Sequence, residues 1–279
     1  MKNYKKIEYF HSHNNARPPQ LNGLIARTEY YLSDTKIEHE KSLYVVLDLL
    51  GAIGGLLDIF IAALVVIFGR YNSSVFLFNY IKEKYNKSGA VFLGCIHRLD
   101  TNVTGIVLFA RTSKALERMN ALFKNRKVQK TYWAIVKRRP KEQEDKLVHW
   151  LKKDGKRNTT AAFDKEVEGA LKADLTYRTI GKLNDHWLLE VKPITGRPHQ
   201  IRVQLATIGS PIRGDLRYGF AKANADRSIN LHARGIYFEH PVKKEGIAVR
   251  AEVPNDQFWE QYLTLPEVKA SDKKIGKSY

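Results

Sequence analysis

From about residue 80 onward, short apolar runs alternate with polar loops. Runs of four to eight apolar or β-branched residues bounded by polar ones are typical of buried strands. The predicted strands are residues 91–96, 106–110, 131–136, 175–180, 187–191, 236–238 and 247–253. Asn184-Asp185, between the fourth and fifth of these, predicts a β-hairpin. A basic linker containing KEQED follows the third.

Two further segments have helical periodicity. Thr112 and Ser113 can cap the first helix, and the second is expected from Thr195 to Ile208, with Pro198 in its first turn and Gly209 just past its end. The apolar stripes are Leu116, Met119, Leu122 and Phe123 in the first helix and Ile201, Leu205 and Ile208 in the second. Strands mixed with helices in this way predict an α+β domain.

The first part of the chain has a different pattern. Residues 1–42 are polar, without periodicity, and resemble neither a signal peptide nor a transit peptide. The 21 residues from Leu49 to Gly69 are apolar except for Asp58, and their length can cross a bilayer. Asp58 and four glycines make insertion only marginally favourable. A membrane span and a buried helix or strand pair therefore both stay open.

Composition narrows the function classes. The chain has 279 residues, is 43% hydrophobic and 27% charged, and is therefore globular, with one large domain or two small ones. A single cysteine, Cys95, excludes an internal disulfide framework, a CxxC pair and a cysteine-built zinc site. That fits a reducing compartment, and we expect a cytoplasmic protein.

The charge is distributed unevenly. Residues 1–79 carry a net charge of +1 and residues 80–279 a net charge of +17. A basic folded surface attracts polyanions, and nucleic acid is the usual partner because phosphate contacts release counterions. A soluble protein with a basic surface and no such partner is the alternative.

Two polar segments in the C-terminal 200 residues are candidates for chemistry. His97-Arg98-Leu99-Asp100, within HRLDTNVTG, lies between two predicted strands, where a loop can present a carboxylate on a rigid frame. Its alternative is a turn aspartate paired with a surface arginine. In QKTYWA, Tyr132 can stack on a base, or it can be a core tyrosine.

A third segment, TGRPHQIRVQL, begins at Thr195. It gathers Arg197, His199, Gln200 and Arg202 at a predicted helix start. Cations and amides beside free backbone N–H groups make an anion or phosphate site. The alternative is a solvated helix face.

Together these motifs make residues 80–262 similar to the RluA-type pseudouridine synthases, which isomerise uridine to pseudouridine in RNA. HRLDTNVTGIVLFART resembles the family's catalytic motif, and QKTYWAIV its Lys-x-Tyr-x-Ala-x-Val strand. TGRPHQIRVQLATIGSPIRGDLRYG and LHARGIYFEHP resemble the third motif and the closing strand. The resemblance implies a mixed, largely antiparallel sheet with flanking helices and a central basic cleft.

The resemblance also implies roles for individual residues. Asp100 corresponds to the catalytic aspartate, Tyr132 to the tyrosine that packs on the target uracil, and Arg202 to the cation that pairs with the aspartate. The further candidates for substrate binding are His97, Arg98, Arg197, His199 and Gln200. The reaction needs no cofactor and no metal, and the sequence has no nucleotide-binding fingerprint and no metal-ligand cluster.

The chain departs from the family ahead of HRLD, where an expected NKPxG-like strand is missing. We therefore divide it into a polar arm (1–42), an apolar segment (43–79), a synthase domain (80–262) and a basic tail (263–279), which we expect to be loose. One hypothesis is a monomeric RNA pseudouridine synthase acting on rRNA or tRNA. The rivals are a catalytically impaired RNA-binding remnant and a membrane-tethered protein, with the tether at Leu49 to Gly69.

Overall fold

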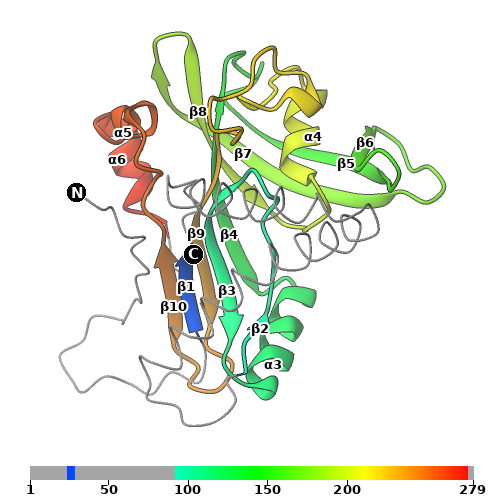
Figure 1. Cartoon of the computed structure of the whole chain (residues 1–279), viewed down its shortest axis with the longest axis vertical. Coiled ribbons are helices and arrows are strands. Elements are labelled where there is room, and N and C mark those ends of the chain that lie inside the picture. The colour runs from blue at the N-terminus through cyan, green and yellow to red at the C-terminus, as the bar shows by residue number, and fades with distance from the viewer. Residues whose placement is uncertain (1–23, 29–91, 276–279) are drawn as a thin grey trace, which may run out of the picture. The chain divides into compact units, whose positions relative to one another are not determined.

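The computed structural model of the chain describes residues 24–28 and 92–275 (Figure 1). The chain divides into two compact units, residues 1–29 with 94–279 and residues 30–93, and the described residues other than 92 and 93 belong to the first. The predicted boundaries after residues 42 and 79 and the apolar segment from Leu49 to Gly69 lie outside the described residues. Within the described ranges, no helix has the length and apolar character needed to cross a membrane.

One mixed sheet organises the described residues. Its strands are β1 (Leu24–Thr28), β2 (Gly94–Cys95), β3 (Thr104–Ala110), β4 (Val128–Val136), β5 (Glu144–Asp154), β6 (Thr159–Phe163), β7 (Leu171–Leu183), β8 (His186–Pro193), β9 (Leu231–Glu239) and β10 (Gly246–Arg250). The order is β1-β3-β9-β4-β8-β7-β5-β6, with β2 beside β3 and β10 beside β9. Among the described strands only β3 and β9 pair in parallel. The predicted mixed, mostly antiparallel sheet is confirmed.

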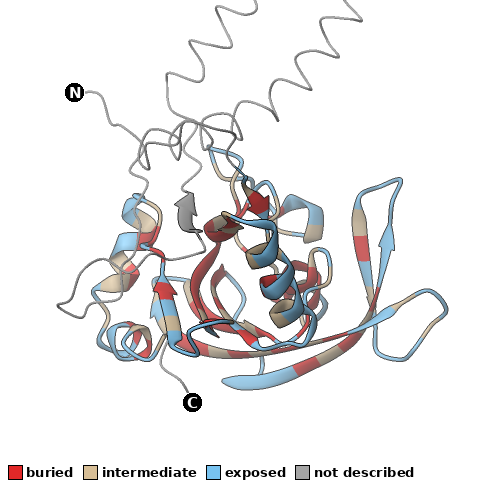
Figure 2. Ribbon diagram, turned by 90° about the horizontal axis from the view of Figure 1, so that it is seen from below, coloured by how far each residue is buried: buried red, intermediate tan, exposed pale blue. Residues whose placement is uncertain are grey.

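Helices cover both faces of this sheet. They are α3 (Ser113–Lys124), α4 (Gln200–Thr207), α5 (Gln257–Leu263) and α6 (Pro266–Asp272), with one 3₁₀ turn, η1 (Leu216–Tyr218). On one face Leu205 of α4 packs with Ala134 of β4 and Leu189 of β8. On the other face Trp259 of α5 and Val268 of α6 pack against alternate residues of the same strands. The buried positions follow the strands through the centre of the sheet and give way to exposed ones at the hairpin tips (Figure 2).

Several predicted elements are present with changed bounds. The α3 helix begins where expected, because the Thr112 hydroxyl accepts a hydrogen bond from the Ala115 amide at 3.1 Å. The β7–β8 hairpin turns at Asn184, whose φ of 53° suits asparagine. The strand expected over 91–96 is only β2, and the one expected over 247–253 ends at Arg250.

The second predicted helix starts later than expected. It begins at Gln200, not Thr195, because His199 has a φ of 54°, a left-handed conformation that no helix interior adopts. Pro198 and Thr195 therefore belong to a loop before α4. Gly209, with a φ of 79°, follows the helix end as expected.

Two segments that were expected to lack regular secondary structure, the basic linker after β4 and the C-terminal tail, contain strands or a helix. The basic stretch after β4 runs into β5, and β6 follows it, because Leu147, His149 and Leu151 occupy alternate positions of β5 and are buried on one face of the sheet. The tail expected to be loose forms α6. Its Asp272 receives the guanidinium of the buried Arg234 in β9, with Nε–Oδ1 and Nη2–Oδ2 distances of 2.9 and 2.7 Å.

Candidate active site

The loop that carries Asp100 lies between β2 and β3. The Val103 amide donates to the Asp100 carbonyl at 2.9 Å and closes a turn, and the Ile229 amide donates to the Asn102 carbonyl at 3.0 Å. Immediately after the loop, Gly105 pairs with Ala233 of β9 at a φ of 118°. A Cβ at Gly105 would lie 2.4 Å from the Ala233 carbonyl oxygen, so only glycine allows this approach. The C-terminal end of the loop is therefore anchored to β9 and to the segment just before it.

Arg202 of α4 connects two carboxylates. Its Nη1 lies 3.1 Å from Oδ2 of Asp100, and its Nε and Nη2 donate to both oxygens of Asp215 at 2.7 and 2.9 Å. Arg202 and Asp215 are buried, whereas the Asp100 side chain is 32% exposed. Of the two carboxylates, Asp100 is thus the one that a ligand can reach.

The charges in this cluster support one another. Burial alone lowers the pKa of Arg202, but the hydrogen bonds and charges of Asp215 and then Asp100 raise it above its ordinary value. The guanidinium therefore stays charged. Its carbon also lies 5.0 Å from the centre of the Tyr218 ring, a cation–π contact.

Tyr132 approaches the cluster from β4. The pairing of β4 with β9 shifts between Thr131 and Tyr132, leaving Arg234 of β9 as an extra residue. Tyr132 is partly buried and packs against the core that contains Ala134 and Leu205. Burial, and after it the charge of Asp100, raise the pKa of Tyr132 well above its usual range. The Tyr132 hydroxyl therefore stays neutral, and it lies close enough to the Asp100 carboxylate for the negative charge to act on it.

His199 completes the cluster. Its Nε2 lies 3.9 Å from Oδ2 of Asp100, and its Nδ1 lies 2.7 Å from the Tyr218 hydroxyl. That hydroxyl accepts a hydrogen bond from the Thr160 amide at 2.9 Å, so its own proton is available for Nδ1. This arrangement places the ring proton of neutral His199 on Nε2, facing Asp100. Burial lowers the pKa of His199, the Asp100 charge raises it, and the net shift is downward.

The remaining candidates occupy other positions. Gln200 is buried, and its amide accepts from the Thr195 hydroxyl at 2.7 Å and donates to the Asp174 carbonyl at 3.0 Å, which ties the loop before α4 to β7. Arg197 donates through Nε to the Lys172 carbonyl at 3.1 Å. Both hold the backbone that leads into α4.

The two residues before Leu99 differ from each other. His97 accepts a hydrogen bond from the Leu108 amide at 3.2 Å, and its ring stacks on Phe123 at 5.1 Å. Burial and the charge of Lys130 lower the pKa of His97 to about 4, so it is neutral at pH 7. Arg98 is exposed. The contacts of His97 are thus with β3 and α3.

Two members of the cluster, Asp215 and Tyr218, were not among the predicted site residues. Both lie in GDLRYG, within the segment that resembles the third family motif. The glycine just before Asp215 could have indicated this site. Gly214 has a φ of 86°, and a Cβ there would clash with Asn224, so the turn that places Asp215 requires glycine. In residues 24–28 and 92–275, no group of three or more His, Cys, Asp or Glu is placed to hold a metal ion.

Comparison with known sequences yields one family. Residues 67–207 match the family described as RNA pseudouridylate synthase. "Ribosomal large subunit pseudouridine synthase C" of Vibrio cholerae is 31% identical over 188 residues, covering 63% of this chain and 56% of that protein. "tRNA pseudouridine synthase C" of Vibrio vulnificus is 34% identical over 184 residues, covering 60% of this chain and 74% of that protein.

Solved structures give the same fold. "Human RNA Pseudouridylate Synthase Domain Containing 4" matches with a TM-score of 0.60 at 20% identity, covering 90% of this chain and 92% of that one. "Human RNA Pseudouridylate Synthase Domain Containing 1" matches with a TM-score of 0.58 at 18% identity, covering 93% and 89%. At these identities the likeness concerns the architecture of the chain.

Proposed function

The chain belongs to the RNA pseudouridylate synthase family, and from this premise we propose that it isomerises uridine to pseudouridine in rRNA or tRNA, with Asp100 as the catalytic carboxylate. One observation carries the proposal. Asp100 and Arg202, 102 residues apart in the sequence, meet at 3.1 Å, and Asp100 remains partly exposed. The names of the relatives include both ribosomal and tRNA synthases, so the proposal names both rRNA and tRNA as substrates and does not choose between them.

The chemistry requires an ionised acid beside a sugar and a base. The N1–C1′ bond of uridine breaks and a C1′–C5 bond forms, while the hydrogen at C5 is lost and N1 gains one. Substrate and product are isomers, so the change needs no redox partner. Asp100, kept beside the guanidinium of Arg202, can act as nucleophile or base.

The other residues of the cluster have supporting roles in this proposal. Tyr132, neutral and adjacent to Asp100, stacks on the target uracil after the base has left its helix, which costs a few kcal/mol. Arg202 holds the carboxylate, and Asp215 holds Arg202. The Tyr218 hydroxyl holds the ring of His199, whose Nε2 lies 3.9 Å from the acid.

The test is Asp100→Asn in the full chain. Transcripts of rRNA and tRNA labelled with tritium at uridine C5 release the label when pseudouridine forms. The variant is expected to lose at least about 10³-fold in rate, with RNA affinity nearly unchanged. Asp226→Asn, an exposed loop aspartate, is the matched control and is expected to keep wild-type turnover.

The outcome also decides between an enzyme and a binding remnant. Pseudouridine mapping of total RNA, with and without the gene, is expected to identify at least one site that depends on the gene. Equal turnover by Asp100→Asn and wild type would overturn the assigned role. RNA binding without isomerisation of any cellular RNA would instead favour the remnant.

A further inference from the structure

The outer strands of the sheet, β5 to β7, have two different faces. Leu151 of β5 and Ala173 of β7 pack with Val203 of α4, and His149 lies 3.0 Å from the Gln204 side chain. Because side chains alternate along a strand, the residues between them point to the opposite face. Among the described residues on that opposite face, Trp150 and Thr176 are partly buried, Lys152 and Lys172 are exposed, and Phe163 on β6 is 37% exposed.

The exposed face combines aromatic rings with lysines. Trp150 of β5 is the cross-strand partner of Phe163 on one side and of Lys172 on the other. The Lys172 ammonium lies 6.0 Å from the centre of the Trp150 ring. Lys152, two residues along β5, is exposed on the same face. Rings that can stack on bases, flanked by cations that can meet phosphates, are typical of single-stranded nucleic acid sites.

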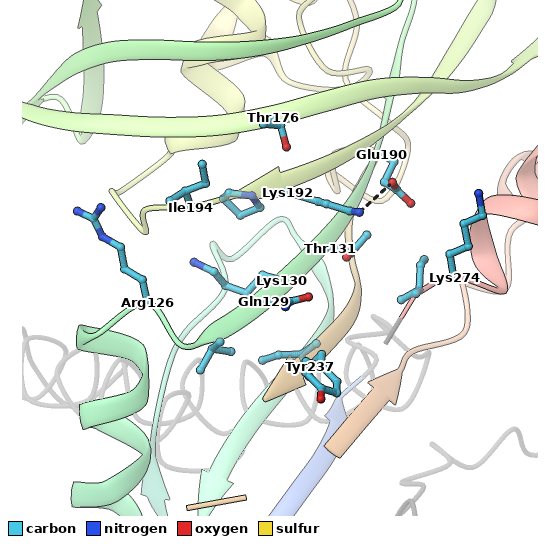
Figure 3. Close-up of a pocket in the computed structure, with 14 residues that line it drawn as sticks. Arg126, Gln129, Lys130, Thr131, Thr176, Glu190, Lys192, Ile194, Tyr237 and Lys274 are labelled. Atoms are coloured by element: carbon cyan, nitrogen blue, oxygen red, sulfur yellow. Dashed lines mark ion pairs between the residues drawn. The ribbon is translucent and has the colours of Figure 1, made fainter. Parts of the chain in front are cut away.

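A cavity of about 290 Å³ lies on the same face, further along β7 and β8 (Figure 3). Thr176, cross-strand partner of Lys192, joins the cavity to the row that begins at Lys172, about 13 Å away along β7 at roughly 3.3 Å per residue. Asp174 lies between Lys172 and Thr176 on the same face. Four cations line the cavity: Arg126, Lys130, Lys192 and Lys274. Glu190 is the one acid among its described lining residues.

The charges of this cavity favour an anion. The Glu190 carboxylate already accepts from the Ser271 hydroxyl at 2.7 Å and from Arg178 at 3.3 Å, and Lys192 lies 3.5 Å away. Burial lowers the pKa of Lys130 to about 8. A phosphate in the cavity would favour the charged form of this lysine.

We propose that this surface, called here the back face and defined by Trp150, Phe163, Lys152, Lys172 and the cations of the cavity, binds a single-stranded stretch of RNA next to the target uridine. Bases stack on the two rings, and phosphates follow the lysines into the cavity. The inference rests on RNA being the substrate, but it assigns contacts on the face of the sheet opposite Asp100. The loop 194–198 leads from Lys192 on the back face to His199, whose Nε2 lies 3.9 Å from Asp100.

The test measures binding by the full chain to a fluorescein-labelled 15-nucleotide oligouridylate, by fluorescence anisotropy over a range of salt concentrations. Lys152→Glu/Lys172→Glu is expected to weaken binding at least tenfold and to make its salt dependence shallower by roughly 1.4 log units per log unit of salt, about 0.7 for each lysine that no longer neutralises a phosphate. Lys114→Glu/Lys127→Glu, exposed in and just after α3, makes the same change in net charge. That control is expected to lose less than threefold.

Stacking has a separate test. Phe163→Leu keeps an apolar side chain on the exposed edge strand but removes the aromatic face. Affinity for the oligouridylate is expected to fall at least fivefold, while thermal unfolding is unchanged. Equal binding losses in the two lysine double variants, or wild-type affinity in both Lys152→Glu/Lys172→Glu and Phe163→Leu, would overturn the proposal.

These results are independent of the catalytic assignment. Asp100→Asn is expected to bind the oligouridylate like the wild type. With an RNA substrate, Lys152→Glu/Lys172→Glu is expected to raise KM and leave kcat unchanged. If Asp100→Asn stays active while the lysine variant loses affinity, the catalytic role of Asp100 is wrong and the back-face proposal is supported. If Asp100→Asn is inactive while the lysine variant binds like the wild type, the catalytic role is supported and the back-face proposal is wrong.

Discussion

Two buried arginines, Arg202 in α4 and Arg234 in β9, are bound in nearly the same way. Arg202 donates through Nε and Nη2 to both oxygens of Asp215, and Arg234 donates through Nε and Nη2 to both oxygens of Asp272. Such two-point pairs fix the plane of the guanidinium as well as its position. Asp272 also accepts from Nη1 of Arg250 at 3.1 Å, but the main difference between the two sites lies in what the third nitrogen of the buried arginine, Nη1, contacts.

Nη1 of Arg234 donates to the Ala251 carbonyl, a backbone group inside the protein. Nη1 of Arg202 donates to Asp100, a side chain that solvent and ligands reach. The Arg234 pair therefore joins α6 to the sheet, whereas the Arg202 pair presents one oriented donor to an accessible acid. The same two-point anchoring thus serves a structural contact at Arg234 and, at Arg202, holds a donor against an acid that a ligand can reach.

The largest effect is expected from Arg202→Met. It leaves Asp215, 1% exposed, as a buried charge without its partner, which costs about 3–5 kcal/mol of unfolding free energy. It also removes the donor to Asp100, so turnover is expected to fall at least about 10²-fold. Urea unfolding and tritium release measure the two effects. An unchanged urea midpoint would contradict the first.

Arg202→Lys separates the two effects. The charge remains, but the two-point geometry on Asp215 is lost, so we expect a smaller loss of stability than for methionine and still a loss of turnover. Wild-type turnover in this variant would mean that the charge near Asp100 matters and its orientation does not.

Asp272→Ala is expected to give the contrasting result at the Arg234 site. Removing the carboxylate from the buried Arg234 is expected to cost about 3 kcal/mol of unfolding free energy. Neither kcat nor KM is expected to change at a temperature where both proteins are folded. Glu267→Ala, an exposed acid in the first turn of the same helix, is the control and is expected to cost less than about 1 kcal/mol.

The smallest expected effect is on the pH dependence of the unfolding free energy, and it involves only the Arg202 site, through His199. His199 has a pKa below that of an unfolded histidine, about 6.5, because burial disfavours its charged form. As the pH falls below about 6.5 the unfolded chain takes up this proton first, so the folded state loses stability relative to higher pH. His199→Gln is expected to reduce this loss, measured as unfolding free energy at pH 7 and pH 5. An identical pH dependence in variant and wild type would contradict it.

Local signals in the sequence were sufficient for much of this fold. Thr112 capped a helix, Asn184 turned a hairpin, and the aromatic and β-branched run ending at Val136 formed a strand, because each depends on neighbours in the sequence. The family assignment from four ordered motifs is confirmed by the comparisons. The meeting of Asp100 with Arg202 agrees with the pairing that the resemblance implied.

What the sequence did not predict depends on distant contacts. In the sequence, β5 resembles a charged linker. It is a strand because α4, which is distant in the sequence, packs over Leu147 and Leu151. The helix α6 is stabilised by Arg234, which lies 38 residues away in the sequence. The start of α4 was placed too early because Gln200 fastens the preceding loop to β7 instead of extending the helix.

The separation of Asp100 and Arg202 also has a consequence during synthesis. At roughly 5–20 residues per second, the 102 residues between them take about 5–20 s to translate. For that interval a nascent chain exposes the acid without its cation. The contact between Asp100 and Arg202 can therefore form only after α4 has been synthesised and has emerged from the ribosome.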